Sequence, residues 1–246
     1  MTRFFLLFWG IFLPFFGTAL GAGAVFFLRQ KTGEGLKKAL FGFSAGVMAA
    51  ASVWSLLIPS LETSGSVFPS VTGFLSGALF FLLGDQILKK TNQRQPEGSH
   101  FAAAVTLHNL PEGMAVGMVL AQEIQKESLP PFPAALVIAV GIALQNIPEG
   151  AIISLPRKAS GKGKASAFLC GVGSGTVEPL GALAALFFTS LIGPLLPYLL
   201  AFAAGAMVYV ISSELIPELR GKGKELGVFL FHLGFILMMT LDVVLG

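Results

Sequence analysis

Two six-residue motifs hold the residues of this sequence that are best suited to metal chemistry. His108–Gly113 reads H-N-L-P-E-G and Gln145–Gly150 reads Q-N-I-P-E-G, so both contain N-x-P-E-G. In each motif the first residue and the glutamate are four positions apart, and the asparagine and glutamate are three apart, which places them on one helix face. Imidazole, carboxylate and amide oxygen together suit Zn²⁺, Fe²⁺ or Mn²⁺, and the lack of a thiolate argues against Cu(I).

The segments that carry these motifs are strongly apolar. Of the 246 residues, 54% are hydrophobic and 12% are charged, about half the charged fraction of a typical soluble domain. Eight stretches are about as long as the ~20 residues that cross a bilayer as a helix: Phe4–Leu28, Leu36–Leu57, Phe68–Leu88, Phe101–Leu120, Phe132–Leu155, Ala165–Leu191, Leu195–Ile216 and Leu226–Leu245. The sequence therefore predicts an all-α polytopic membrane protein with eight transmembrane helices.

Both motifs lie deep inside predicted spans. Counted from the inner ends of the fourth and fifth spans, they reach one level, slightly inside the midplane. Glu178, in the sixth span, adds a third carboxylate near that depth. Ionisable groups at such depths cost roughly 2.5–3.5 kcal/mol each, so they normally line an ion path. A network that only fixes helix packing explains three buried glutamates poorly, because without a cation they must be protonated or repel one another.

Lysine and arginine are distributed unevenly between the two sides. Of the 16, all but Arg3 and Lys126 lie at or beside the links that follow the first, third, fifth and seventh spans. Cationic loops are retained in the cytoplasm, so we expect these links inside and both termini outside the cell. Residues 89–100 form the one long polar stretch and are predicted to be a flexible cytoplasmic link. We expect the lipid bilayer, and no nucleic acid, as a partner.

Two pairs of segments indicate internal symmetry. Ala45–Met48 and Ser55–Pro59 resemble Ala204–Met207 and Ser213–Pro217, with a slip of one residue. They lie in the second and seventh spans, which run in opposite directions. Such inverted repeats are common in secondary transporters, although small-residue helix packing can also produce the match. We predict an inverted repeat of outer helices around a central helix pair.

Other polar residues in the spans have less distinctive interpretations. Glu214 is either an exit-path or proton-relay carboxylate or a residue that reaches the inner surface. Asp85 and Asp242 lie near span ends and are predicted to be interfacial anchors, and Asp85 could also guide metal at the inner mouth. His232 is predicted to be a buried histidine with a hydrogen-bond partner, and Cys170 to be a packing residue.

The two motifs, together with G-S-G-T-V-E-P at Gly173–Pro179 and A-G-A-M-V-Y at Ala204–Tyr209, resemble the ZIP (Zrt/Irt-like) divalent-metal transporters of the GufA-type branch. The resemblance covers all eight spans. It implies extracellular termini, as the charges do. It also implies a homodimer in which the first, fourth, fifth and sixth helices carry metal past a scaffold formed by the other four.

The resemblance also implies two adjacent metal sites. The inner site would consist of His108, Glu112, Gln145, Glu149 and Glu178. The second site would consist of Asn109, Glu112, Asn146 and Glu149, with both glutamates bridging. Some family members carry a carboxylate in place of Asn146, so the second site should be weaker here. The long histidine-rich cytoplasmic loop of many members is absent from this sequence.

These observations predict a single transport domain over residues 1–246 that moves divalent metal across the cell membrane toward the cytoplasm. Zinc is the expected substrate, with Cd²⁺, Fe²⁺ and Mn²⁺ left open. The sequence contains no G-x-x-x-x-G-K-[ST] motif, so we expect no ATP hydrolysis by this chain. The rival is an intramembrane metallo-hydrolase, which needs a ligand pair such as H-E-x-x-H, whereas His108 is the one histidine at that depth. We therefore expect no enzyme activity.

Overall fold

The computed structural model describes residues 2–27, 34–90, 99–126, 128–129, 133–159, 161–221 and 224–245. Within these ranges, the side chains that fall outside the description are those of Lys37, Leu107, His108, Pro111, Ala159, Leu245 and residues 88–90 and 99–104.

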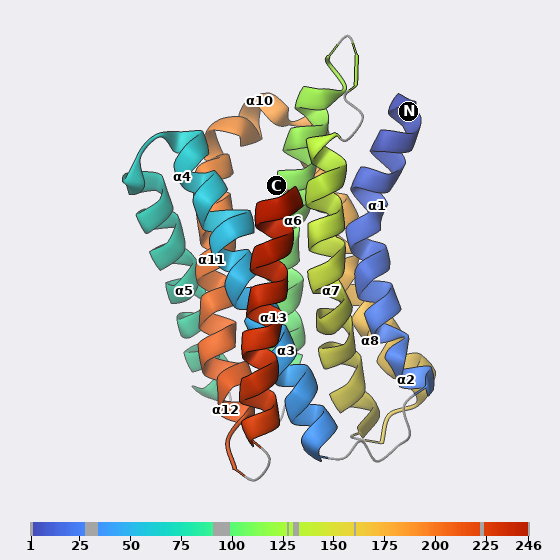
Figure 1. Cartoon of the computed structure of the whole chain (residues 1–246). Coiled ribbons are helices and arrows are strands. Elements are labelled where there is room, and N and C mark those ends of the chain that lie inside the picture. The colour runs from blue at the N-terminus through green and yellow to red at the C-terminus, as the bar shows by residue number, and fades with distance from the viewer. Residues whose placement is uncertain are drawn as a thin grey trace.

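The described residues form a bundle of long helices (Figure 1) and contain no strand. The helices of the first half are α1 (Arg3–Ala22), α2 (Ala24–Phe27), α3 (Glu34–Ala51), α4 (Ile58–Ser64), α5 (Val67–Lys90) and α6 (Ser99–Glu123). Those of the second half are α7 (Ala134–Ala159), α8 (Lys164–Gly175), α9 (Val177–Phe187), α10 (Thr189–Ile192), α11 (Leu196–Val210), α12 (Ile216–Glu218) and α13 (Lys224–Leu245). Three short segments complete the order: the π-helical η1 (Ser52–Leu57) and η3 (Ile211–Leu215) and the 3₁₀ turn η2 (Gly193–Leu195).

Seven helical stretches in the described part of the chain are long and apolar enough to cross a membrane. They are Arg3–Phe27, Glu34–Ser64, Val67–Ile87, Ala134–Lys158, Lys164–Phe187, Thr189–Glu218 and Lys224–Val244. The prediction of a polytopic all-α protein is therefore confirmed. The predicted span Phe101–Leu120 is not among the seven, but it lies within α6, a 25-residue helix. Both chain ends lie at the same end of the bundle (Figure 1).

Two of the predicted continuous spans are interrupted. The first breaks at Gly23, between α1 and α2, and the sixth breaks at Thr176, between α8 and α9. The second interruption lies immediately before Val177, Glu178 and Pro179. Proline lacks an N–H but fits the first turn of a helix, so Pro179, the third residue of α9, leaves no hydrogen bond of that helix unmade. Glu178 thereby lies in the first turn of α9.

The packing of the helices agrees with the expected inverted repeat. The most extensive contacts are α3 with α13, α11 with α5, α1 with α7 and α9 with α6. The repeat relates the first span to the sixth, the second to the seventh, the third to the eighth and the fourth to the fifth. This exchange turns the α3–α13 contact into the α11–α5 contact, and the α1–α7 contact into the α9–α6 contact. The π-helical segments η1 and η3 also match, because each directly precedes an Ile-Pro pair. They have 6 and 5 residues, so the one-residue slip falls within them.

Hydrogen bonds connect the lysine- and arginine-rich links at one end of the bundle, as the charge distribution predicts. Lys38 Nζ donates to the carbonyl of Arg220 at 2.6 Å, and Lys164 Nζ donates to the carbonyl of Phe26 at 3.4 Å. These contacts bring together links after the first, fifth and seventh spans. At the opposite end, an Arg3 guanidinium nitrogen donates to the carbonyl of Lys126 at 3.0 Å. The two cations outside the main group thus lie together.

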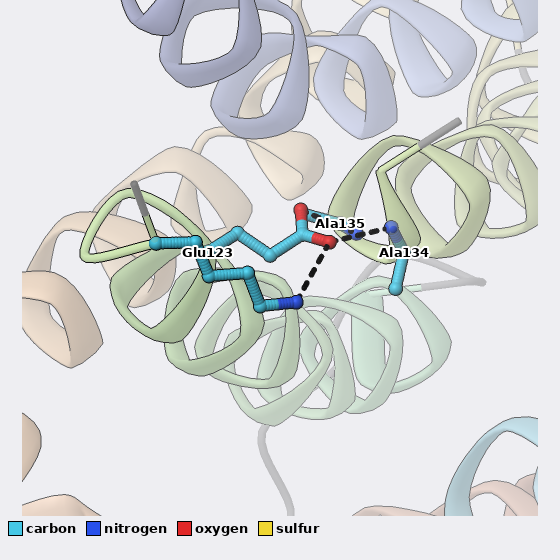
Figure 2. A network of polar contacts seen from close by, with 4 residues as sticks. Glu123, Ala134 and Ala135 are labelled. Carbon is cyan, nitrogen blue, oxygen red and sulfur yellow. Dashed lines mark hydrogen bonds and ion pairs between the residues drawn. The ribbon is translucent and has the colours of Figure 1, made fainter. Parts of the chain in front are cut away.

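Glu123 joins the ends of the two motif helices α6 and α7. Its buried carboxylate accepts from the backbone N–H of Ala134 at 2.8 Å and of Ala135 at 3.3 Å (Figure 2). These N–H groups belong to the first turn of α7, where the helix's own carbonyls cannot serve as acceptors, so Glu123 caps the helix. Lys126 Nζ lies 4.0 Å from the same carboxylate. The cap fixes the position of α7 relative to α6.

Candidate metal centre

Six of the seven predicted ligands are fully buried where α6, α7 and α9 meet. Each is at most 1% exposed: Asn109, Glu112, Gln145, Asn146, Glu149 and Glu178. The two motifs lie in α6 and α7, and Glu178 begins α9. Hydrogen bonds join Asn109 to Glu178 and Gln145 to Glu112. The structure thus places three carboxylates and three amides in the buried interior of an apolar bundle.

The two motifs face each other directly. Gln145 Nε2, from the α7 motif, donates to Glu112 Oε1, from the α6 motif, at 2.6 Å. This contact joins the first residue of one motif to the glutamate of the other. The expectation that both motifs lie at one level is therefore correct.

The two asparagines are oriented by backbone carbonyls of the helices opposite them. Asn109 Nδ2 donates to the carbonyl of Ser174 at 3.4 Å, and Asn146 Nδ2 donates to the carbonyl of Pro14 at 3.3 Å. A carbonyl oxygen can only accept, so each amide must turn its nitrogen toward the neighbouring helix. Each Oδ1 is consequently turned away from that carbonyl.

Glu178 receives two hydrogen bonds on one oxygen. Asn109 Nδ2 lies 2.8 Å and Thr18 Oγ1 lies 3.1 Å from Glu178 Oε1. Glu178 Oε2 is buried and receives no hydrogen bond from any residue that the structure describes. Thr18, in α1, was not among the residues predicted from the sequence, because a lone threonine in an apolar span carries no signal for a site.

The cluster is rich in acceptors that lack donors. Four buried oxygens accept no hydrogen bond within the described ranges: Asn109 Oδ1, Gln145 Oε1, Asn146 Oδ1 and Glu178 Oε2. Leaving a buried acceptor unpaired costs about 1–3 kcal/mol. A divalent cation would satisfy several such oxygens at once, and amide and carboxylate oxygens suit hard and borderline cations. The arrangement is therefore chemically suited to bind a metal ion.

His108, the seventh predicted ligand, belongs to α6, but its side chain lies outside the described residues. In the described part of the chain, no three His, Cys, Asp or Glu side chains form a group that could hold a metal ion. The predicted ligand sets include three amides in addition to the carboxylates and the imidazole. Their role as ligands stays a prediction.

Close helix contacts hold the motifs in place. The last residue of each motif is a glycine that packs against a backbone carbonyl: Gly113 against Glu178, and Gly150 against Thr18. A β-carbon at either position would overlap that carbonyl oxygen. Larger residues would therefore push α9 away from α6, or α1 away from α7, at the level of the cluster.

The other predicted polar residues lie outside this cluster. Asp85 accepts from the hydroxyl of Tyr209 at 2.7 Å, and Asp242 accepts from Ser55 at 2.8 Å, so both carboxylates contact neighbouring helices. His232 is exposed on α13 and its Nδ1 lies 2.8 Å from the carbonyl of Val228. The prediction that His232 is buried is wrong, because its own helix supplies the partner on the outer face. Glu214 is half-buried in η3, and its role stays open.

Comparisons with known proteins agree with the resemblance. A family model described as ZIP Zinc transporter matches residues 100–242. The Zinc transporter ZIP11 of Homo sapiens is 34% identical over 96% of this chain and 96% of its own length. The Zinc transporter GufA of Myxococcus xanthus is 37% identical over 94% and 96%, and the Zinc transporter ZIPB of Bordetella bronchiseptica is 35% identical over 94% and 79%. The chain therefore belongs to the ZIP family of zinc transporters.

Proposed function

We propose that this chain moves Zn²⁺ toward the cytoplasm through the buried cluster between α6, α7 and α9. Membership of the ZIP family makes it a membrane transporter of divalent metal rather than an enzyme, and the comparisons give no support to the metallo-hydrolase alternative. We choose this site because four of its buried acceptor oxygens receive no hydrogen bond from any residue that the structure describes. A passing dication would pair with them.

Two overlapping positions for the ion follow from the residues. The inner site would use His108, Glu112, Gln145, Glu149 and Glu178, and the second would use Asn109, Glu112, Asn146 and Glu149. Their shared glutamates would let an ion move between them without losing all its carboxylate ligands. Cd²⁺, Fe²⁺ and Mn²⁺ are further candidate substrates, since the same ligand types bind them.

We further propose one transport domain over residues 1–246, working as a homodimer in the cell membrane with both termini outside. The clustering of Lys38, Arg220 and Lys164 contacts at one end of the bundle supports this orientation. Labelling of cysteines introduced at each end of the bundle with an impermeant thiol reagent tests it.

The deciding experiment is Zn²⁺ uptake into proteoliposomes that contain the purified full chain. Empty liposomes and a Glu112→Ala/Glu149→Ala double variant serve as controls. We expect saturable uptake by wild type and background uptake by the double variant. Competition by Cd²⁺, Fe²⁺ and Mn²⁺, with and without a pH gradient, ranks the metals. Wild-type uptake equal to that of empty liposomes would contradict the proposal.

A further inference from the structure

A constant sequence separation relates α1 to α9. Leu20-Gly21-Ala22 in α1 recurs as Leu180-Gly181-Ala182 in α9, 160 residues later, the same separation that divides Thr18 from Glu178. Gly21 packs against the carbonyl of Ile147, and Gly181 packs against the carbonyl of Leu110. Ile147 and Leu110 are the third residues of the two motifs. Helix α1 therefore sits on α7 as α9 sits on α6.

The asparagines extend this correspondence to the cluster itself. Asn109 donates to the carbonyl of Ser174, one helical turn before Glu178. Asn146 donates to the carbonyl of Pro14, one turn before Thr18. Thr18 thus occupies, in the first half of the inverted repeat, the place that Glu178 occupies in the second.

The hydrogen bond of Thr18 departs from the common behaviour of threonine in a helix. Thr72, Thr189 and Thr240 each donate to a carbonyl four residues back in the chain, as hydroxyl groups in helices often do. The corresponding carbonyl for Thr18 is that of Pro14, which accepts from Asn146. The hydroxyl of Thr18 instead crosses to Glu178 Oε1.

This bond leaves the two oxygens of Glu178 unequal. Oε1 accepts from both Thr18 and Asn109, whereas Oε2 receives nothing from the described residues. A carboxylate held in this way offers one oxygen to a cation. Zn²⁺ prefers four ligands, and larger cations use higher coordination numbers and bidentate carboxylates.

We propose that Thr18 is the inverted-repeat counterpart of Glu178 and the positioning residue that makes Glu178 bind metal through one oxygen, which favours Zn²⁺ over the larger Cd²⁺. This inference rests on the proposed function, because it assumes that Glu178 meets the ion.

The first test compares Thr18→Val, which keeps the shape but lacks the hydroxyl, with Thr18→Ser, which keeps the donor. In proteoliposomes we expect Thr18→Val to raise the KM for Zn²⁺ by roughly tenfold, the effect of losing a hydrogen bond to a charged group. The KM for Cd²⁺ should change less, so the preference for zinc falls, and Thr18→Ser should behave as wild type. Unchanged KM values for both metals in Thr18→Val would overturn the proposal.

The second test exchanges the two residues. Glu178→Thr should lose Zn²⁺ uptake, and Thr18→Glu/Glu178→Thr should regain part of it, because Asn146 can donate to a carboxylate at position 18 as Asn109 does at 178. A folded double variant as inactive as Glu178→Thr would overturn the correspondence. The rise in melting temperature on adding Zn²⁺ is measured in parallel for every variant. Absence of wild-type uptake would then count against the proposed function, while the metal-induced shifts would still decide the role of Thr18.

Discussion

Gln145 and Glu112 pair across the interface of α6 and α7, with Nε2 of the amide 2.6 Å from Oε1 of the carboxylate. The contact uses the nitrogen of Gln145, so its oxygen is left as an acceptor that no described residue fills. A neutral amide thus holds a buried carboxylate in place without neutralising its charge. The pair remains able to attract a cation, which a lysine or arginine at position 145 would repel.

Glu149 and Asn146 should differ in importance for transport. We predict that Glu149→Ala reduces Zn²⁺ uptake to background, because it removes a charged ligand common to both proposed sites. Asn146→Ala removes one neutral oxygen from the weaker site and should cost roughly tenfold in apparent affinity. Initial rates over a range of Zn²⁺ concentrations separate the two effects. Wild-type uptake by Glu149→Ala would rule out the two-site interpretation.

The carboxylates and amides of the cluster could be predicted from the sequence, because charged residues stand out inside apolar spans. N-x-P-E-G at one depth in two antiparallel spans already places Glu112 near Gln145, and the structure confirms that contact. Thr18 could not be found in this way, since a hydroxyl is tolerated in any helix. Its position becomes informative only when α1 is compared with α9 through the contacts of Gly21 and Gly181.

The helix break and the loop cap also escaped prediction. The run Ala165–Leu191 is apolar enough to be taken as one span despite Glu178, so hydropathy alone does not reveal the interruption at Thr176. Glu123 lies at the end of a span, where an acidic residue normally contacts water. Its burial depends on its contact with the start of α7, where the N–H groups of Ala134 and Ala135 meet its carboxylate. That contact is a tertiary feature with no local sequence signal.

Gly150 should be intolerant of even one added carbon. We predict that Gly150→Ala lowers the melting temperature by several degrees, because its β-carbon would overlap the carbonyl of Thr18. Gly173→Ala is the matched control, since no described atom beyond its chain neighbours and its own helix backbone lies within 4 Å of a β-carbon built there. That change should be neutral, or stabilising by up to about 1 kcal/mol, because alanine favours helix over glycine. Equal melting temperatures for the two variants would mean that α1 and α7 can separate without cost.

Glu123 should contribute to stability through its cap of α7. Glu123→Ala removes the acceptor for two backbone N–H groups and should destabilise by about 1–2 kcal/mol. Amide hydrogen exchange at Ala134 and Ala135 should accelerate in this variant. Lys126→Ala is the control, because its exposed ammonium, 4.0 Å from the carboxylate, should contribute less than about 1 kcal/mol. A larger effect of Lys126→Ala than of Glu123→Ala would show that the ion pair, and not the cap, is the stabilising contact.

Asn146 should limit the cluster to one ion at a time. Two dications would face the three carboxylates Glu112, Glu149 and Glu178, and the uncompensated charge in a low-dielectric interior is unfavourable by several kcal/mol. Asn146→Asp supplies a fourth carboxylate, so the measured stoichiometry should rise toward two Zn²⁺ per chain and metal release should slow. An aspartate also cannot donate to the carbonyl of Pro14, which Asn146 does at 3.3 Å. The metal-free variant should therefore melt at a lower temperature than wild type, and added Zn²⁺ should raise that temperature by more. Isothermal titration and thermal unfolding measure both effects, and two tightly bound Zn²⁺ per wild-type chain, unchanged in Asn146→Asp, would refute the charge argument.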